Sequence, residues 1–285
     1  MLALVPYYPP PVFNIFDIPL DSWSLLVSLG FIVGVEFARA RAVRLGIAVK
    51  DVVDGGLFIV GMGFVVGHLV HVLAYNPHLI EEQGWIILLK VWAGFSSNGG
   101  FLGAIIGTTV WFKWIRKREP FWKHADTIAF SLPFGWFFGR LGCFSAHDHV
   151  GRRSDFFLAV DFPVDIYGGY YGGPRHDLGL YEAIWVFVLA VLFWSIRNRP
   201  LRHSSFAMLF CLLYSPVRFS LDFLRNTDLQ GADVRLAGLT PAQYGSILLL
   251  IAGVALYLRR NKEQQYCFVS ASDRRDPSPS TVENQ

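Results

Sequence analysis

Long apolar runs separated by short polar stretches are the main pattern along this chain of 285 residues. A helix needs about 20 mostly apolar residues to cross the hydrocarbon core of a bilayer. The runs therefore predict an all-α fold, a multi-pass integral membrane bundle of about seven transmembrane helices. The predicted spans are residues 21–43, 53–75, 98–115, 125–144, 178–197, 204–224 and 241–259.

Three segments outside these spans have their own composition. Residues 84–97 are apolar but short and broken by glycine, so we expect them to be interfacial or re-entrant. Residues 145–177 are rich in glycine and aromatic residues, which suits a small ordered periplasmic cap loop and, almost equally, a flexible loop. The polar residues 261–285 predict a disordered cytoplasmic tail behind a transmembrane domain of residues 1–260.

Lysine and arginine gather in alternate connections, after the first, third, fifth and seventh predicted spans. Because positively charged short loops stay in the cytoplasm, this pattern predicts a chain that is N-out/C-in. The N-terminal segment lacks a basic region and contains three successive prolines at 9–11. We therefore expect it to remain attached and not to act as a secretory signal peptide.

Composition supports a membrane environment and limits the kinds of partner that the chain is expected to bind. The chain is 53% hydrophobic and 16% charged, which is more apolar than a typical soluble domain. The net charge of +3 is small, and the basic residues alternate with apolar runs. The lipid bilayer is thus a predicted partner, and nucleic acid is not. The three cysteines are far apart and show neither a disulfide framework nor zinc spacing.

Two arginines, Arg140 and Arg218, fall inside predicted spans. An ionised side chain at membrane depth costs roughly 2.5–3.5 kcal/mol on insertion scales, so each needs a partner or a wet cavity. A guanidinium matches phosphate with a planar fork of donors, which favours a lipid headgroup as that partner. The alternative for Arg140 is that it extends to the interface while Gly139 and Gly142 pack helices.

Acidic residues near these arginines suggest a charged cluster. Asp222 lies four residues after Arg218 and three before Arg225, so on a helix it can pair with both and leave a net positive site. The alternative is an ion-pair cluster that only locks helices together. Glu182 lies one turn into its span and is expected to point inward toward the arginines.

Two further groups of residues suit an anion or a metal. Asn98, Gly99 and Gly100 open a predicted helix, where exposed backbone N–H groups can bind an anion; close helix packing explains these glycines equally well. The triplet of residues 147–149, His-Asp-His, contains metal-binding side chains. No further ligand stands at a standard spacing, so we predict no metal. His68 and His71 share one helical side, as bases or as hydrogen-bonded residues inside the bundle.

The order of these motifs resembles the prolipoprotein diacylglyceryl transferase family over about residues 20–260. The resemblance rests on the glycine helix start at 99–103, Gly-Arg-Leu-Gly at 139–142, Gly-Arg at 151–152, Leu-Tyr-Glu at 180–182, and the paired arginines at 218 and 225. The segments 139–144 and 218–225 are its most specific pieces.

The resemblance implies a bacterial inner-membrane enzyme of lipoprotein biosynthesis without a cofactor. Such an enzyme moves the diacylglyceryl group of phosphatidylglycerol to the lipobox cysteine thiol in the signal peptide of a preprolipoprotein. The implied catalytic residues are Arg140, Arg218, Asp148, His147 and His149. The implied lipid-binding residues are Arg140, Arg218, Gly142, Gly151, Asn98, Gly99, Gly100, Glu182, Asp222 and Arg225.

The sequence departs from the family pattern at positions that concern proton transfer. Asn98 stands where many members have histidine, and Cys143 stands where they have asparagine. Candidate bases by position are His147, His149 and His176. Two alternative functions follow: a divergent relative acting on another lipid or acceptor, or a lipid or anion transporter. A transporter should show pairs of broken helices in corresponding halves of the chain.

Overall fold

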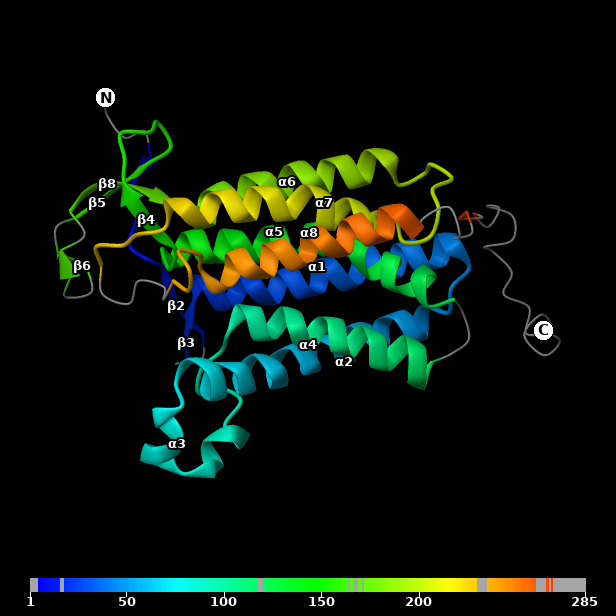
Figure 1. Cartoon of the computed structure of the whole chain (residues 1–285), viewed down its shortest axis with the longest axis horizontal. Helices are drawn as coiled ribbons and strands as arrows, with labels where there is room; N and C mark the ends of the chain where they lie inside the picture. The colour runs from blue at the N-terminus through cyan, green and yellow to red at the C-terminus, as the bar shows by residue number, and fades with distance from the viewer. Residues whose placement is uncertain are drawn as a thin grey trace. The chain divides into compact units, whose positions relative to one another are not determined.

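The computed structural model describes residues 5–15, 18–116, 120–163, 165–166, 169–170, 172–229, 235–259, 265–266 and 268, and it is mostly helical (Figure 1). The chain divides into two compact units. The first unit comprises Met1–Val35, Ala129–Arg199 and Ser205–Arg259; the second comprises Glu36–Ile128, Pro200–Ser204 and Arg260–Gln285.

Helices occupy the segments that the apolar runs predicted. They are α1 (Ser22–Leu45), α2 (Val49–Val70), α3 (His78–Gln83), α4 (Ser97–Val110), α5 (Phe121–Ala146), α6 (Leu178–Ile196), α7 (Ser205–Leu221) and α8 (Pro241–Arg259). Single π-helical turns at His71–Tyr75 and Trp111–Ile115 continue α2 and α4, and 3-10 turns lie at Trp85–Leu89 and Asp222–Leu224.

Five of the described helical segments are long and apolar enough to cross a membrane, which identifies an integral membrane protein. They are Ser22–Leu45, Val49–Tyr75, Leu178–Ile196, Ser205–Leu224 and Pro241–Arg259. The other two predicted spans, 98–115 and 125–144, coincide with α4 plus its π turn and with α5. That these two also cross the bilayer remains a prediction.

Polar side chains define where two helices of the first unit begin. Asp177 precedes α6 and accepts a hydrogen bond from the Leu180 amide at 3.1 Å, as an N-cap does. Thr240 precedes α8, which starts with proline. Thr240 Oγ1 accepts from the Gln243 amide at 3.2 Å, and Gln243 Oε1 accepts from the Thr240 amide at 3.0 Å. This reciprocal pair is a capping box, which fixes the start of α8.

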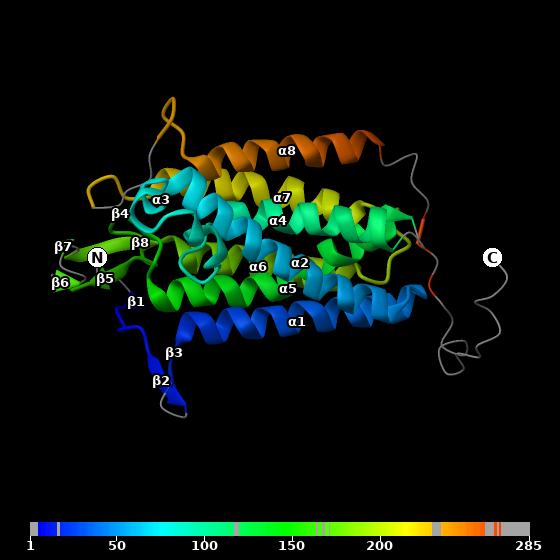
Figure 2. The same cartoon turned by 90° about the horizontal axis from the view of Figure 1, so that it is seen from below.

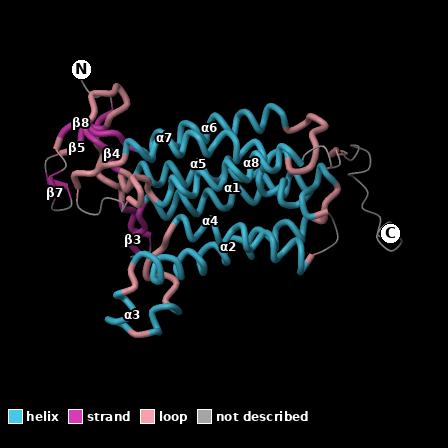
Figure 3. Tube along the Cα trace, in the orientation of Figure 1, coloured by secondary structure: helices cyan, strands magenta, loops and turns pink. Residues whose placement is uncertain are grey.

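Short strands lie at one end of the helices of the first unit, where the sequence had predicted an all-α fold with a cap loop (Figure 3). A four-stranded sheet has the order β1-β5-β8-β4. Its strands are β1 (Val5–Pro6), β5 (Val160–Phe162), β8 (Gly173–Asp177) and β4 (Val150–Arg153); only the β1–β5 pair is parallel. The all-α prediction is therefore wrong for the cap, which is an ordered sheet.

Two hairpins accompany the sheet, β2 (Val12–Ile15) with β3 (Ile18–Asp21) and β6 (Asp165–Ile166) with β7 (Gly169–Tyr170). The sheet forms because alternate residues of β5 pack inward: Val160 and Phe162 are buried while Asp161 is exposed. Val5 and Tyr7 of the N-terminal segment pack against the same cluster. The N-terminal segment is thereby part of the cap.

Glycines allow helices of each unit to approach closely. In the first unit, a Cβ at Gly30 of α1 would lie 2.6 Å from the Gly135 carbonyl oxygen of α5, and these helices run side by side (Figure 2). In the second unit, a Cβ at Gly99 of α4 would lie 2.7 Å from Val70 Cβ. The glycines of α4 therefore allow close packing against α2, which was the alternative to an anion site at these glycines.

Part of the predicted disordered tail is ordered in the second unit. Tyr266 is buried in the cluster formed with Ala42 and Val52, and its hydroxyl donates to Asp126 at 2.5 Å. Burial, with the Asp126 carboxylate beside it, raises the pKa of Tyr266. The disorder prediction thus does not hold at this position. Residues 269–285 lie outside the described residues.

Candidate active site

A single buried carboxylate lies between the two arginines that the sequence placed at membrane depth. Glu182 Oε1 is 2.9 Å from Arg140 Nε, and Glu182 Oε2 is 3.6 Å from Arg218 Nε. The first contact is an ion pair without hydrogen-bond geometry. Glu182 Oε1 also accepts a hydrogen bond from the Tyr214 hydroxyl. Three helices, α5, α6 and α7, thus contribute one cluster, and Glu182 points toward both arginines.

Arg140 is held inside the first unit instead of extending outward. The residue is only 5% exposed, and its guanidinium carbon lies 4.7 Å from the Trp136 ring centroid. Arg140 Nη1 is 3.8 Å from Cys143 Sγ, a weak contact. A lysine or arginine that snorkels keeps its charged head in water, so this burial argues against the snorkelling alternative.

Asp222 joins the ends of two helices to the arginines. It follows the last residue of α7 and is fully buried. Its Oδ1 accepts from Arg218 Nη1 at 2.6 Å and lies 3.3 Å from Arg225 Nε. Its Oδ2 accepts from the Thr240 hydroxyl. The helix ends before Arg225, so the expected i, i+7 pair does not share one α-helix, yet Asp222 contacts both arginines.

The ion pairs of this cluster involve more guanidiniums than carboxylates. Three guanidiniums, from Arg140, Arg218 and Arg225, face two carboxylates, from Glu182 and Asp222. Buried charges are stable only when paired, and an incompletely compensated cationic cluster attracts an anion. The guanidiniums can therefore bind a phosphate group in addition to their own carboxylate partners.

The cap contacts the segment that carries Arg225. Gly151 of β4 forms a bridge with Arg225, and a Cβ at Gly151 would lie 2.6 Å from the Leu224 carbonyl oxygen. Arg152 Nε donates to the Arg225 carbonyl at 3.2 Å. Gly151 is thus a position where only glycine allows the two segments to meet.

A buried arginine holds the other side of the cap. Arg175 of β8 is fully buried and donates through both Nη atoms to Asp228, at 3.1 and 2.6 Å. Arg175 also donates to the Gly151 carbonyl at 3.2 Å. This two-pronged pair with Arg175 keeps the pKa of Asp228 below its ordinary value. Neither residue was identified from the sequence.

His147 is a structural residue in this arrangement. Its Nδ1 lies 2.8 Å from Asp177 Oδ2, and its Nε2 lies 3.2 Å from the Tyr8 carbonyl oxygen. Both ring nitrogens face acceptors, so neither is available to take a proton from a substrate. Burial raises the pKa of Asp177, and the hydrogen bond from His147 opposes that rise. These contacts give His147 a structural role, and a catalytic role for it remains an untested prediction.

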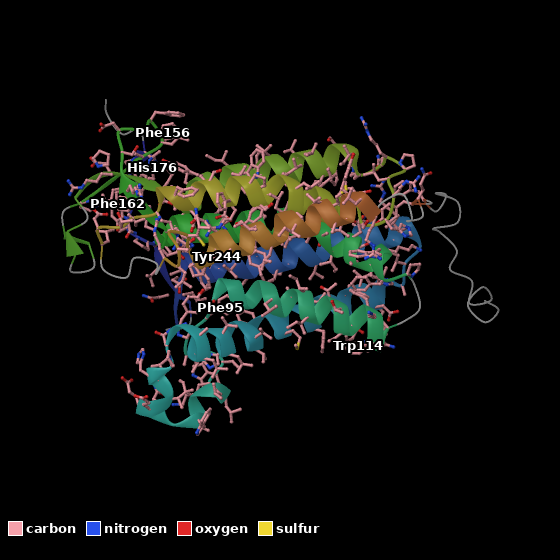
Figure 4. The ribbon with its side chains drawn as sticks, in the orientation of Figure 1. Phe95, Trp114, Phe156, Phe162, His176 and Tyr244 are labelled. Carbon is pink, nitrogen blue, oxygen red and sulfur yellow. The ribbon has the colours of Figure 1, made fainter. Side chains whose placement is uncertain are left out.

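His149 and Asp148 remain in reach of a substrate. His149 Nδ1 is hydrogen-bonded to Asp148 Oδ1, and the two side chains are 17% and 41% exposed. His176 lies in the cap beside Phe156, as Figure 4 shows, and its Nδ1 is 2.9 Å from the Tyr181 hydroxyl. Burial lowers the pKa of His176, which favours its neutral form.

Gly142, Gly99 and Gly100, three of the predicted site positions, have packing contacts within their own units. Gly142 of α5 packs near the backbone of Trp23. Asn98, Gly99 and Gly100 belong to the second unit, where the N-cap of α4 is Ser96, which accepts from the Gly99 amide at 3.4 Å. The side chain of Asn98 lies outside the described part of the chain.

His68 of α2 and His71 of the π turn that follows it play separate roles within the second unit. His68 is fully buried, and its ring nitrogens lie 3.0 Å from the Gly94 carbonyl oxygen and 2.8 Å from that of Ile87. These contacts connect α2 to residues 84–97. They agree with the interpretation of His68 as a hydrogen-bonded residue inside the bundle. His71 instead contacts Asn76 within its own π turn.

Sequence reasoning missed two residues that position the cluster. Tyr214 lies four residues before Arg218, and this i, i+4 spacing places both on one side of α7. Thr240 opens Thr-Pro-Ala-Gln, a capping-box pattern that is readable from sequence. Tyr214 orients Glu182, and Thr240 orients Asp222.

Comparisons with known proteins identify relatives over most of the chain. The family model described as prolipoprotein diacylglyceryl transferase matches residues 10–259. A protein of Mannheimia succiniciproducens is 37% identical over 232 residues, which are 79% of this chain and 82% of that protein. One from Solidesulfovibrio magneticus is 30% identical over 264 residues, 91% of this chain and 97% of that protein. Both relatives are named phosphatidylglycerol–prolipoprotein diacylglyceryl transferase.

Proposed function

Because the chain belongs to the prolipoprotein diacylglyceryl transferase family, we propose that it transfers the diacylglyceryl group of phosphatidylglycerol to a preprolipoprotein. The acceptor is the thiol of the lipobox cysteine in the signal peptide, and the reaction is the first step of bacterial lipoprotein maturation. The relatives' names support both substrates. In this chain the supporting observation is the pair of guanidinium side chains, 6% and 12% exposed, that share Glu182.

Arg140 and Arg218 act as a clamp for the phosphate of phosphatidylglycerol. Glu182 keeps the two guanidiniums on one side of the cluster, 2.9 and 3.6 Å from its two oxygens. Donors fixed before the reaction stabilise charge that develops in the transition state, because they need no reorganisation at that moment. Here the growing charge is on the phosphate oxygens of the leaving group.

The transfer itself is a substitution at the glyceryl carbon next to the phosphate. The acceptor thiol loses its proton, its sulfur forms the C–S bond, and the C–O bond to phosphate breaks. The bonding electron pair leaves with glycerol phosphate. Since a free thiol has a pKa of about 8.5, a positive field near the sulfur raises the reactive thiolate fraction. The guanidiniums of the clamp supply such a field to an acceptor thiol that approaches the phosphate.

The chain is placed in the bacterial inner membrane with seven spans, N-out and C-in. Pairing of β1 with β5 supports a common side for the N-terminal segment and the 145–177 cap. Packing of Tyr266 against Leu201 supports a common side for the tail and the connection between α6 and α7. The basic connections belong to this second side, as the positive-inside rule requires.

Complementation tests this function directly. A bacterial strain depleted of its own diacylglyceryl transferase receives this chain, and lipidation of a reporter prolipoprotein is followed by gel shift. We expect lipidated reporter with the natural chain and with Arg199→Ala, an exposed arginine outside the cluster. Unlipidated reporter despite normal membrane levels of the protein would support the divergent relative instead.

A further inference from the structure

Three metal-binding side chains converge where α5 ends. One ligand atom each from Cys143, Asp148 and His149 lies within 4.8 Å of the other two. Cys143 is in the last turn of α5, and the other two follow it in the turn that leads to β4 (Figure 1). The grouping differs from the His-Asp-His triplet read from the sequence, because His147 turns away to Asp177.

The backbone explains how a sulfur ligand replaces His147 in this group. His147 has a φ of 50°, the left-handed conformation that commonly ends a helix. The chain therefore turns back at this residue, and the Asp148 amide lies 3.4 Å from the Cys143 carbonyl oxygen. This reversal brings the side chains of residues 148 and 149 over the last turn of α5, beside Cys143.

The ligand types select the class of metal. Thiolate, imidazole and carboxylate together are donors typical of zinc, and three protein ligands with an open fourth position are typical of catalytic zinc sites. Ligand atoms around tetrahedral zinc lie roughly 3–4 Å apart, given bond lengths of about 2.0–2.3 Å. Atoms within 4.8 Å of one another are near this spacing, and Asp148 and His149 must give up their mutual hydrogen bond to hold the ion. The exposure of Asp148 and His149 leaves an entry path for the ion.

We propose that Cys143, Asp148 and His149 bind a zinc ion whose fourth position takes the thiol of the acceptor peptide. The inference rests on the transferase function proposed above and deepens it. Asn98 cannot take a proton near neutral pH, and His147 has no free nitrogen. A thiol that coordinates zinc is deprotonated outright, so no general base is needed.

The step is balanced in protons and electrons. On coordination the acceptor thiol releases its proton to water. The zinc-bound thiolate then gives an electron pair to the glyceryl carbon, forming the C–S bond. The C–O bond to phosphate breaks, and its electron pair leaves with glycerol phosphate. The metal changes neither oxidation state nor ligands from the protein.

Position and charge suit this role. Arg140 Nη1 lies 3.8 Å from Cys143 Sγ, so the metal-bound thiolate stands next to the phosphate clamp, as a displacement requires. The two anionic ligands neutralise the zinc charge.

Cobalt substitution tests the site on the full-length protein in phosphatidylglycerol nanodiscs. Purified protein is stripped with a chelator and titrated with Co²⁺, whose thiolate charge-transfer absorption reports a sulfur ligand. We expect about one Co²⁺ per chain for the natural protein and for Cys211→Ser, a control at the other described cysteine. Cys143→Ser should lose the charge-transfer band, and both Cys143→Ser and His149→Leu should weaken Co²⁺ binding at least about tenfold.

The acceptor peptide provides the second readout. Adding a lipobox peptide should shift the charge-transfer band, and the same peptide with serine in place of cysteine should not. Absence of Co²⁺ binding in a chain that still transfers diacylglyceryl would overturn the metal site and leave the transferase function standing. If the charge-transfer band does not shift when the lipobox peptide is added, the proposal that the acceptor thiol takes the fourth position is wrong. Metal binding with peptide shift but no transfer would refute the transferase function and retain the site.

Discussion

A single carboxylate compensates the charges of two arginines that lie within helices. Each guanidinium alone would carry a large insertion cost, and Glu182 compensates both at once from α6. Asp222 does the same for Arg218 and Arg225, and a hydroxyl orients each carboxylate. In the proposed function, the guanidiniums of this cluster also receive the phosphate of the lipid.

Replacing Glu182 with glutamine should destabilise the protein most when no anionic lipid is present. The amide keeps the shape but removes the charge between Arg140 and Arg218, and breaking a buried ion pair costs about 3–5 kcal/mol. Thermal unfolding in detergent should show a clear fall in Tm, and added phosphatidylglycerol should recover part of it by supplying phosphate charge.

The matched control for this change is Glu36→Gln. Glu36 pairs with Arg39 on α1, but its side chain is 56% exposed, and surface pairs contribute about 0–1 kcal/mol. If the two variants unfold at the same temperature without lipid, the compensating role of Glu182 is wrong.

At the residue scale, the sequence predicted the charged residues of the arginine cluster but not the backbone turn at His147. Arg140 and Arg218 stood out because charge is rare inside apolar runs, and Asp222 followed from helical spacing. The approach of Cys143 to His149 depends on the left-handed φ of His147, a conformation that histidine adopts more often than most residues but that its presence alone does not predict. The metal-ligand grouping therefore required coordinates.

Helix ends, more than helix centres, shape the site at the scale of elements. The last turn of α7 and the capping box of α8 meet at Asp222. The N-cap of α6, Asp177, also holds His147 in the cap. The N-cap residues Asp177 and Thr240 therefore each start a helix and fix a neighbouring side chain. A change at Thr240 reaches the arginine cluster through Asp222.

Thr240→Val should show this coupling. Losing the cap costs about 1 kcal/mol, and Asp222 Oδ2 is left without its hydroxyl donor in a buried position. We expect Tm to fall by at least about 2–4 °C and transfer activity to fall with it. Thr109→Val is the control, because Thr109 is exposed and bonds only its own helix, at Ile105. Equal effects of the two substitutions would contradict the coupling.

The Arg175–Asp228 pair should make the cap sensitive to acid. Its hydrogen bond with Arg175 puts the folded pKa of Asp228 below the ordinary value of 3.8, so the stabilisation is present above 3.8 and is lost as pH falls through the folded pKa. The Tm difference between the natural chain and Asp228→Asn should thus be largest near about pH 7 and shrink toward about pH 3. A difference that stays constant or grows on acidification would exclude this pair as its source.

At the element scale, helices were predictable and strands were not. Runs of about 20 apolar residues predict helices from local sequence alone. The strands are two to five residues long, and β1 pairs with β5 from more than a hundred positions away. Tyr266 is a similar case, because two aromatic residues in a polar tail gave no local signal that Tyr266 packs beside Asp126.

At the scale of the whole molecule, the described contacts group the connections into two sets. The N-terminal segment and the 145–177 cap share one sheet, and the α6–α7 connection and the tail share one core cluster. The proposed orientation assigns the first set to the outside, where phosphatidylglycerol of the outer leaflet and exported signal peptides are both available.

Fusions of alkaline phosphatase, which is active only outside the cytoplasm, check this assignment. An insertion after Asp155 in the cap should be active, and one after Arg199 should be inactive. The prediction follows from the basic connections staying inside. The reverse pattern, or activity at both positions, would overturn the N-out/C-in orientation.

The central claim is that two guanidiniums clamp one lipid phosphate, and the rate of transfer in phosphatidylglycerol nanodiscs tests it most directly. Arg140→Ala and Arg218→Ala should each lower kcat/KM at least about 100-fold, as removal of a preorganised charge donor does, while Arg199→Ala leaves the rate unchanged. A folded Arg140→Ala or Arg218→Ala protein that transfers diacylglyceryl at the natural rate would contradict the account.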